Sequence, residues 1–169
     1  MSTLSVFAPP PTSSLPELSD ADLVRLRAAV DVEMRRRKIA FTIGQMGEQL
    51  AIAYFNATPG CPNLILAPPG TANVDALSRR GERYSIKTVC NAKKTGTIYP
   101  DPVDRDKQLF EYILLVRMTS EWALNAIYEF DWKAFVECRK WDKRMTAWYI
   151  GISRKTLARA REYTVVPRT

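Results

Sequence analysis

The chain has 169 residues, a net charge of +7, a pI of about 9.5 and no histidine. This length suffices for one domain with a buried core, and the charge favours an acidic partner, nucleic acid first, although charge alone does not exclude an ordinary soluble basic protein. The lack of histidine excludes Ser-His and Cys-His nucleophiles, histidine-based zinc sites and nucleases with a histidine base, so hydrolytic chemistry would have to use carboxylates, lysines, hydroxyls and metal.

Three cysteines, Cys61, Cys90 and Cys138, lie far apart and form no C-x-x-C pair. Their odd number and spacing indicate neither a disulfide framework nor a zinc site, and they fit a reducing cytoplasm. No apolar run is long enough to span a membrane, and residues 1–16 lack the basic and apolar regions of a secretory signal. We therefore expect a cytoplasmic protein with no membrane partner.

The chain is expected to begin with an arm and a helix. Residues 1–18 contain a Pro-Pro-Pro run with several Ser and Thr, which predicts a disordered or extended arm before a single domain over 19–169. Ser19 would cap the first helix, and the run 35–38 is basic, as is typical of a helix C-terminus. Solvation of this end, contact with DNA, and packing of the helix against a second copy are the alternatives. The helix carries one apolar stripe, formed by Leu23, Leu26, Val30 and Met34.

A second helix is predicted over residues 42–56, because Thr42 and Gln45 form a capping box. Glu48 lies on a face of this helix that is otherwise small or apolar. A carboxylate in such a place is costly unless it has a partner. An arginine or a solvated edge would provide one, and so would a metal ion that other acidic residues also hold.

The segment that organises the chain is a hairpin between residues 73–77 and 83–89, which follows a first strand over 63–67. Both flanks alternate apolar and polar residues, the period of a half-buried strand. Gly81 suits the left-handed position of a three-residue loop over 79–81. This register places Asp75 opposite Ser85, with Lys87 one step away on the same face. A carboxylate, a hydroxyl and an ammonium would then project together, while four apolar residues would point to the other side: Val74, Ala76, Tyr84 and Ile86.

The order of a helix with Glu48, a strand with Asp75 and a strand with Ser85-Ile86-Lys87 resembles the core of the PD-(D/E)XK nuclease superfamily, over roughly residues 40–130. The resemblance implies a restriction-endonuclease-like fold of the α/β (α+β) class, with a mixed central β-sheet flanked by helices. It also implies a site for Mg²⁺, or for Mn²⁺ in its place.

In that resemblance Asp75 would be the central metal ligand, with Glu48 and the backbone carbonyl of Ile86 as further ligands. Lys87 would orient the attacking water and stabilise the charge of the transition state. Ser85 departs from the family pattern, because most members carry Asp or Glu at this position. An acid from another element would compensate, with Glu48 as the first candidate; Glu82 is a second, although its strand parity points it away from Ser85.

Basic residues cluster around this hairpin, as expected for a protein that contacts phosphates. The expected nucleic-acid contacts are Arg79, Arg80, Arg83, Lys93 and Lys94. Lys93 and Lys94 lie in a polar connection over 90–107, and long loops of this kind are often functional or mobile. Ordinary solvated charges are the alternative, and for these two lysines an equally good one.

The remaining elements are predicted from capping residues and apolar runs. Residues 109–116 are nearly all apolar, as in a strand that is buried on both faces. Further strands are expected over 122–130 and 146–150, with an edge strand at Val165 and Val166. Two helices are expected: one that Asp131 caps and that runs through Cys138, and one from Ser153 that bears Arg154, Lys155, Arg159 and Arg161. Arg139-Lys140 and Lys143-Arg144 predict a second basic patch.

Three functions are consistent with these patterns. The first is a magnesium-dependent endonuclease, most simply of the restriction type and acting on DNA, for which a homodimer is expected because two strands must be cut. The second is a non-catalytic nucleic-acid-binding or regulatory protein on a degenerate nuclease fold, which Ser85 favours. The third is a structural or interaction protein whose basic charge is incidental, and which would show no salt-dependent binding to DNA.

Overall fold

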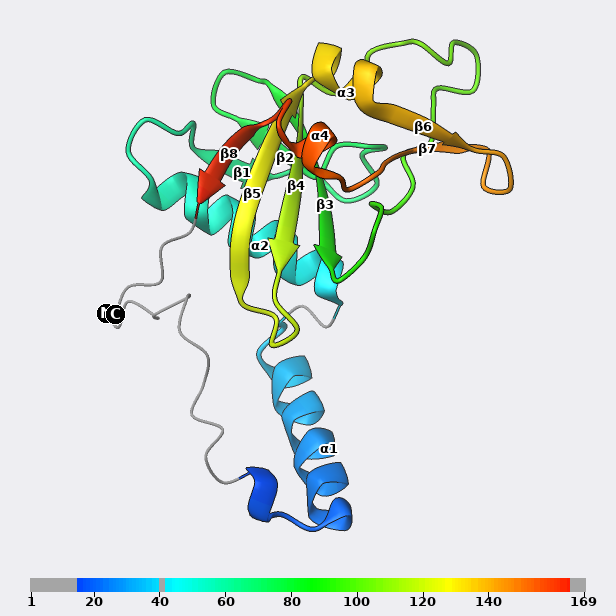
Figure 1. Ribbon diagram of the computed structural model, residues 1–169. Coiled ribbons are helices and arrows are strands. Elements are labelled where there is room, and N and C mark those ends of the chain that lie inside the picture. The colour runs from blue at the N-terminus through cyan, green and yellow to red at the C-terminus, as the bar shows by residue number, and fades with distance from the viewer. Residues whose placement is uncertain (1–14, 40–41, 165–169) are drawn as a thin grey trace.

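The computed structural model describes residues 15–39 and 42–164, in which a mixed sheet has helices on both of its faces (Figure 1). The sheet has six strands in the order β1-β2-β3-β4-β5-β8, and β3 with β4 is its parallel pair. The strands are Leu64–Leu66 (β1), Ala76–Ser78 (β2), Arg83–Cys90 (β3), Tyr112–Met118 (β4), Leu124–Asp131 (β5) and Arg161–Thr164 (β8). The predicted mixed sheet with flanking helices is therefore confirmed at the level of the fold class.

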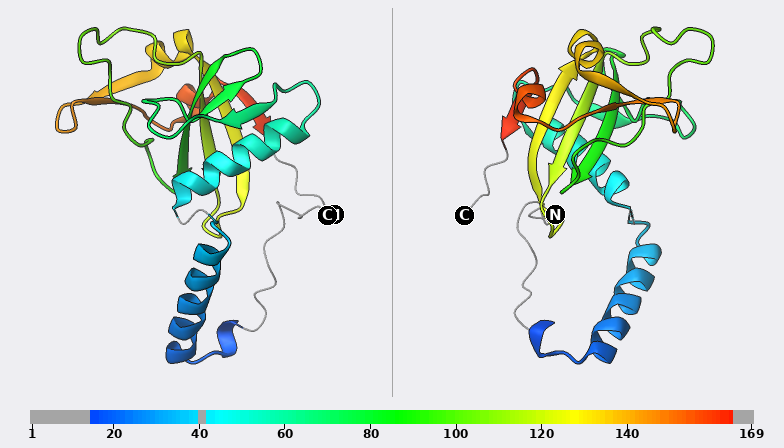
Figure 2. Two further views of the ribbon diagram at one scale, coloured as in Figure 1. Left: turned by 180° about the vertical axis from the view of Figure 1, so that it is seen from behind. Right: turned by 45° about the vertical axis from the view of Figure 1, so that its right-hand side comes forward.

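Helix α2 (Ile43–Ala57) covers one face of the sheet, as the view from behind in Figure 2 shows. It begins at the predicted capping box, in which Thr42 and Gln45 satisfy each other's backbone N–H groups. Its buried side chains Leu50, Ala51 and Phe55 pack on the central strands. This packing fixes the helix over β3 and β4 and sets the place of every other residue that α2 carries.

The opposite face is covered by α3 (Trp132–Cys138), α4 (Arg154–Leu157) and a ribbon of β6 (Arg139–Asp142) and β7 (Ala147–Ile150). Strand β4 contributes side chains to the hydrophobic cores on both faces of the sheet. Its side chains alternate between the two cores, with Leu114 and Val116 toward α2 and Ile113 and Leu115 toward α3. The prediction of a strand that is buried on both faces is confirmed.

The polar connection between β3 and β4 is held by β7 along part of its length. Ile98 and Trp148 exchange both backbone hydrogen bonds at 2.8 Å, and the N–H of Thr95 donates to the carbonyl of Ile150. Ile98 is fully buried. The middle of this connection is thus part of the core.

The C-terminal part differs from the prediction because strand pairing and stacking override the local pattern. Helix α4 ends at Leu157, so Arg159 lies beyond it and Arg161 belongs to β8, where it pairs with Glu129 of β5. The predicted patch around Arg139 is strand β6. The guanidinium of Arg139 stacks 4.1 Å from the ring centre of Trp148 and pairs with Asp106, so Arg139 is not a free surface charge.

Helix α1 (Asp20–Arg36) leads away from the sheet in all three views, and none of its residues is buried (Figures 1 and 2). Ser19 caps it as predicted, by accepting a hydrogen bond from the N–H of Asp22. A short 3-10 turn, Leu15–Glu17, precedes it.

Some predictions fall on residues outside the described ones. The first 14 residues of the predicted arm and the edge strand at Val165 and Val166 are among them. Within residues 15–39 and 42–164, none of the helices combines the length and the apolar character that crossing a membrane requires.

Candidate active site

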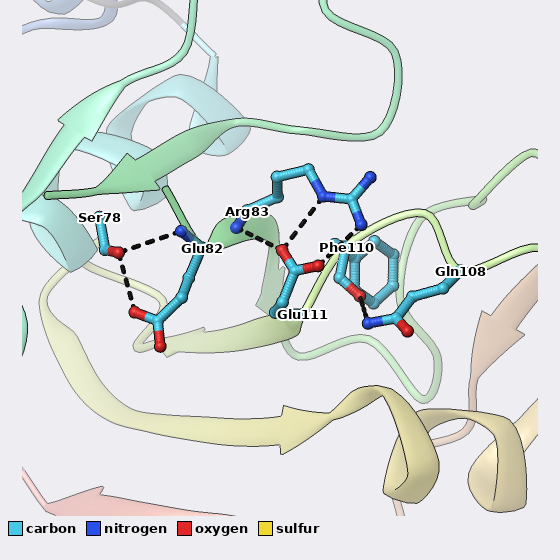
Figure 3. Close-up of polar contacts among 6 residues, drawn as sticks. All are labelled: Ser78, Glu82, Arg83, Gln108, Phe110 and Glu111. Atoms are coloured by element: carbon cyan, nitrogen blue, oxygen red, sulfur yellow. Dashed lines mark hydrogen bonds and ion pairs between the residues drawn. The ribbon is translucent and has the colours of Figure 1, made fainter. Parts of the chain in front are cut away.

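The hairpin between β2 and β3 forms with the predicted three-residue loop. Ser78 closes the loop, since its hydroxyl donates to Glu82 at 2.8 Å and accepts from the backbone N–H of Glu82 at 3.2 Å (Figure 3). Gly81 has a φ of 83°, the left-handed conformation for which a glycine was expected. The loop therefore sets the register of the two strands, as the sequence predicts.

Asp75 lies one residue before β2, opposite Ser85. Its oxygen Oδ2 accepts a hydrogen bond from the backbone N–H of Ile86 at 2.6 Å and one from the hydroxyl of Ser85 at 3.3 Å. The same oxygen lies 3.6 Å from Nζ of Lys87. The structure thus brings together three of the predicted site residues, Asp75, Ser85 and Lys87, around one carboxylate.

The carboxylate of Asp75 replaces a backbone acceptor in the ladder. The backbone N–H of Asp75 donates to the carbonyl of Tyr84 at 2.8 Å, and the side chain of Asp75 accepts from the N–H of Ile86, two residues further along β3. In a β-strand the N–H and the C=O of one residue point to the same edge. The carbonyl of Ile86 therefore points to the same side of β3 as its N–H, the side on which Asp75 lies. This carbonyl is the one that the sequence analysis named as a metal ligand.

The second oxygen of Asp75, Oδ1, makes no hydrogen bond with the residues that the structure describes. The side chains of Asp75 and Lys87 are 24 % and 21 % exposed, so both are accessible from outside. A rigidly held carboxylate with one oxygen left over is suited to binding a cation.

Ser85 occupies the position where the resembled family most often carries an acid. It is fully buried, and its hydroxyl donates to Asp75. A buried hydroxyl in this position holds the carboxylate in place, but it is a weak ligand for a hard cation. Ser85 is therefore a positioning residue.

Glu48 is brought beside the hairpin by the close packing of α2 on β3. Gly47 makes this approach possible, because a Cβ there would lie 1.9 Å from Oγ1 of Thr88. The pKa of Glu48 is raised, first by partial burial and then by the negative charge of Asp75, while Lys87 lowers it. Glu48 thus experiences both charges of the site, although within the described residues it makes no hydrogen bond or ion pair.

The donor set is all oxygen, which fits a hard divalent cation. The carboxylate of Asp75 lies beside the ammonium of Lys87, and the charges of both act on Glu48, which carries the second carboxylate of the site. Among the described residues no group of three or more His, Cys, Asp or Glu side chains is placed to hold a metal. Magnesium is commonly held by one or two carboxylates, with water and substrate phosphates completing its shell, so Asp75, Glu48 and the Ile86 carbonyl fit this pattern.

The predicted nucleic-acid contacts are distributed along the hairpin and not gathered at Asp75. Arg79 and Arg80 are exposed at the loop, four or more residues from Asp75, which corresponds to roughly 13 Å along a strand. Arg83 is engaged with Glu111, to which its guanidinium donates at 2.7 and 3.1 Å and its backbone N–H at 2.6 Å (Figure 3). Arg83 is thus a structural residue.

Lys93 and Lys94 lie past the other end of β3, and both are exposed. Nζ of Lys94 pairs with Asp142 at 3.0 Å and lies 4.8 Å from the ring centre of Tyr149. Lys94 therefore links the connection to the β6–β7 ribbon, and Lys93 is the more available of the two charges.

Sequence analysis missed a cavity of about 430 Å³ at the loop end of the hairpin. Glu82 lines it, as does Glu129 of β5, whose pKa is raised mainly by burial and which accepts a hydrogen bond from the hydroxyl of Tyr163 at 3.4 Å. The signal in the sequence was Glu129, a single acid among the apolar and aromatic residues 126–130 of β5. Glu82 accepts a hydrogen bond from Ser78 at the loop, and neither Asp75 nor Lys87 lines this cavity.

In comparisons with known proteins, no family model and no curated sequence matches the chain.

Proposed function

We propose that the chain is a divalent-metal-dependent nuclease of the PD-(D/E)XK type that acts on DNA. One observation carries the proposal: a single carboxylate, that of Asp75, is held by the N–H of Ile86 and lies 3.6 Å from Nζ of Lys87. The acid and the lysine are the pair that the family resemblance names, and their proximity supports the proposal. The positive net charge of the chain supports a polyanionic substrate.

A divalent metal ion in this site would supply a nucleophilic water and neutralise charge on the phosphate. Asp75, Glu48 and the carbonyl of Ile86 would hold it. Asp75 is fixed before any substrate arrives, so little reorganisation accompanies binding. Lys87 is partly buried and carries a positive charge beside this carboxylate, where it stabilises negative charge that develops on a phosphate oxygen and orients the attacking water.

The test compares cleavage of plasmid and oligonucleotide DNA in Mg²⁺, Mn²⁺ and EDTA. Lys87→Ala and Asp75→Asn should each lower the rate by about 10²–10³-fold, as expected when a group that stabilises transition-state charge is lost. Asparagine is chosen because its amide oxygen can still accept from Ile86, which protects the fold. Lys143→Ala, in the exposed β6–β7 turn, removes the same charge far from the site and should cleave as the parent does.

Full cleavage by both site variants, or equal cleavage in EDTA and in Mg²⁺, would show that the site is elsewhere. Thermal unfolding of each variant serves as the check on folding. A midpoint close to that of the parent assigns the loss of activity to the chemistry.

A second function rests on the buried Ser85, which leaves two carboxylates where many nucleases have three acidic groups. The protein would then bind nucleic acid without cutting it. In that case the parent shifts DNA in a gel in any divalent metal but leaves it intact, and Ser85→Asp, which restores a carboxylate, gains metal-dependent cleavage.

A further inference from the structure

The apolar stripe of helix α1 does not pack on the sheet or its covering helices. Leu23, Leu26 and Val30 are 38 %, 41 % and 47 % exposed, and the described part of the chain buries no residue of α1. The helix stands apart from the sheet in all three views (Figures 1 and 2). An isolated helix of this length is only marginally stable in water, because helices in proteins are stabilised chiefly by packing of their apolar face. We therefore expect the apolar stripe of α1 to pack against a partner.

The charges of α1 indicate what this partner is. Asp20 and Asp22 lie in its first turn, and Arg35 and Arg36 in its last turn. A second α1 in antiparallel orientation would set each acidic end beside a basic end, and the two helix dipoles would also oppose each other. A parallel copy would set acid beside acid and base beside base.

The stripe is also complementary to itself in the antiparallel orientation. When Leu26 of one copy lies opposite Val30 of the other, the two-fold relation also places Val30 of the first copy opposite Leu26 of the second. Leu23 then lies opposite the turn that carries Glu33 and Met34. The same register thus matches apolar residues in the middle and brings the acidic first turn of each copy to the level of the basic last turn of the other.

We propose that two copies of the chain associate through α1 in an antiparallel pair, with the stripe of Leu23, Leu26, Val30 and Met34 at the interface. The C-terminal end of each α1 leads to its own sheet domain, so the two domains lie at opposite ends of the pair. A 17-residue helix is about 25 Å long, which sets the scale of their separation. The dimer would present two copies of the domain to one polyanion, and its formation does not depend on nuclease activity.

The first test measures mass against protein concentration by sedimentation or light scattering. The parent should approach twice its 19.2 kDa and dissociate on dilution. Val30→Lys should raise the dissociation constant at least about tenfold, because it puts a charge in the apolar interface. Val32→Lys is the matched control: Val32 is 58 % exposed and lies about 200° around the helix from Val30, so its replacement should leave the dimer intact. A parent that is monomeric at every concentration, or equal effects of the two variants, would overturn the proposal.

The second test distinguishes the orientation with Leu26→Cys and Val30→Cys, made separately. In an antiparallel pair the two positions face each other across the interface, whereas each is offset from its own counterpart by about 6 Å along the axis and lies beyond disulfide reach. Oxidation should therefore crosslink an equal mixture of the two variants and neither variant alone, above the background of the parent. Crosslinking of each variant alone would overturn the antiparallel arrangement.

Discussion

At the scale of single residues, the position of the site depends on a glycine. Gly47 faces Thr88 of β3 so closely that no side chain fits between helix and strand, and Glu48 follows it directly. Gly44, one turn earlier, has no such neighbour: a Cβ there would lie 3.8 Å from its nearest atom, Oγ1 of Thr42. A side chain is therefore sterically excluded at Gly47, whereas there is room for one at Gly44.

Gly47→Ala should lower the free energy of unfolding by about 1–3 kcal/mol, the usual cost of overpacking, and should lower cleavage because α2 moves away from β3 and takes Glu48 with it. Gly44→Ala is the matched control and should be neutral or stabilising by up to ~1 kcal/mol, because alanine favours the helix. Chemical denaturation measures both changes. Equal destabilisation by the two variants would contradict the close contact.

At the scale of elements, the contact between Arg83 and Glu111 ties the start of the hairpin strand to the start of β4. Besides the side-chain pair, the N–H of Glu111 donates to the carbonyl of Arg83, and the carbonyl of Glu111 accepts from Trp132. The guanidinium of Arg83 holds the pKa of Glu111 below its ordinary value. This pair therefore contributes to stability as long as Glu111 is ionised.

Glu111→Gln should lower the free energy of unfolding at pH 7 by ~1 kcal/mol, a modest figure because both side chains are about one-third exposed. The folded-state pKa of Glu111 is lowered, so the contribution is complete above the ordinary glutamate pKa of about 4.3 and is lost as the pH falls through the folded-state value. The gap between parent and variant should thus narrow below about pH 4. Glu121→Gln, at an exposed turn, should differ from the parent by less than ~0.5 kcal/mol throughout. A gap for Glu111→Gln that stays constant with pH would contradict the ion pair.

At the scale of the whole molecule, part of the positive charge is internally neutralised. Arg83, Lys94 and Arg139 each pair with a carboxylate. Arg79 and Arg80 are exposed in the loop that joins β2 to β3, the strand that carries Lys87. We expect this pair to contribute most directly to contact with a nucleic acid at the site.

Arg79→Gln with Arg80→Gln should weaken DNA binding and reduce the slope of log K against log salt by roughly 1.8, since each phosphate contact contributes about 0.9. Lys143→Gln with Arg144→Gln removes the same net charge from the β6–β7 turn and should change the slope less. Binding titrations at several salt concentrations compare the two. Equal changes would mean that net charge, and not the hairpin, governs binding.

The sequence by itself determined the local structure around the site. The caps at Ser19, Thr42 and Asp131, the loop at Gly81 and the register that sets Asp75 opposite Ser85 all follow from residues a few positions apart. Such features depend on short-range hydrogen bonds and on the two-residue period of a strand, which a sequence displays directly.

Only the tertiary structure decided which charged side chains form ion pairs within the protein and which remain exposed to bind a partner. The pairing of Arg83 with Glu111 and of Arg139 with Asp106 joins residues 28 and 33 positions apart. The pairing of Ile98 with β7 likewise joins distant segments, as does the close approach of Gly47 to Thr88, which brings α2 against β3. These contacts depend on how helices and strands pack, and side chains distant in sequence meet only when the sheet is assembled. The apolar face of an amphipathic helix is usually buried against its own domain. That the stripe of α1 is exposed instead is evident only from the tertiary structure.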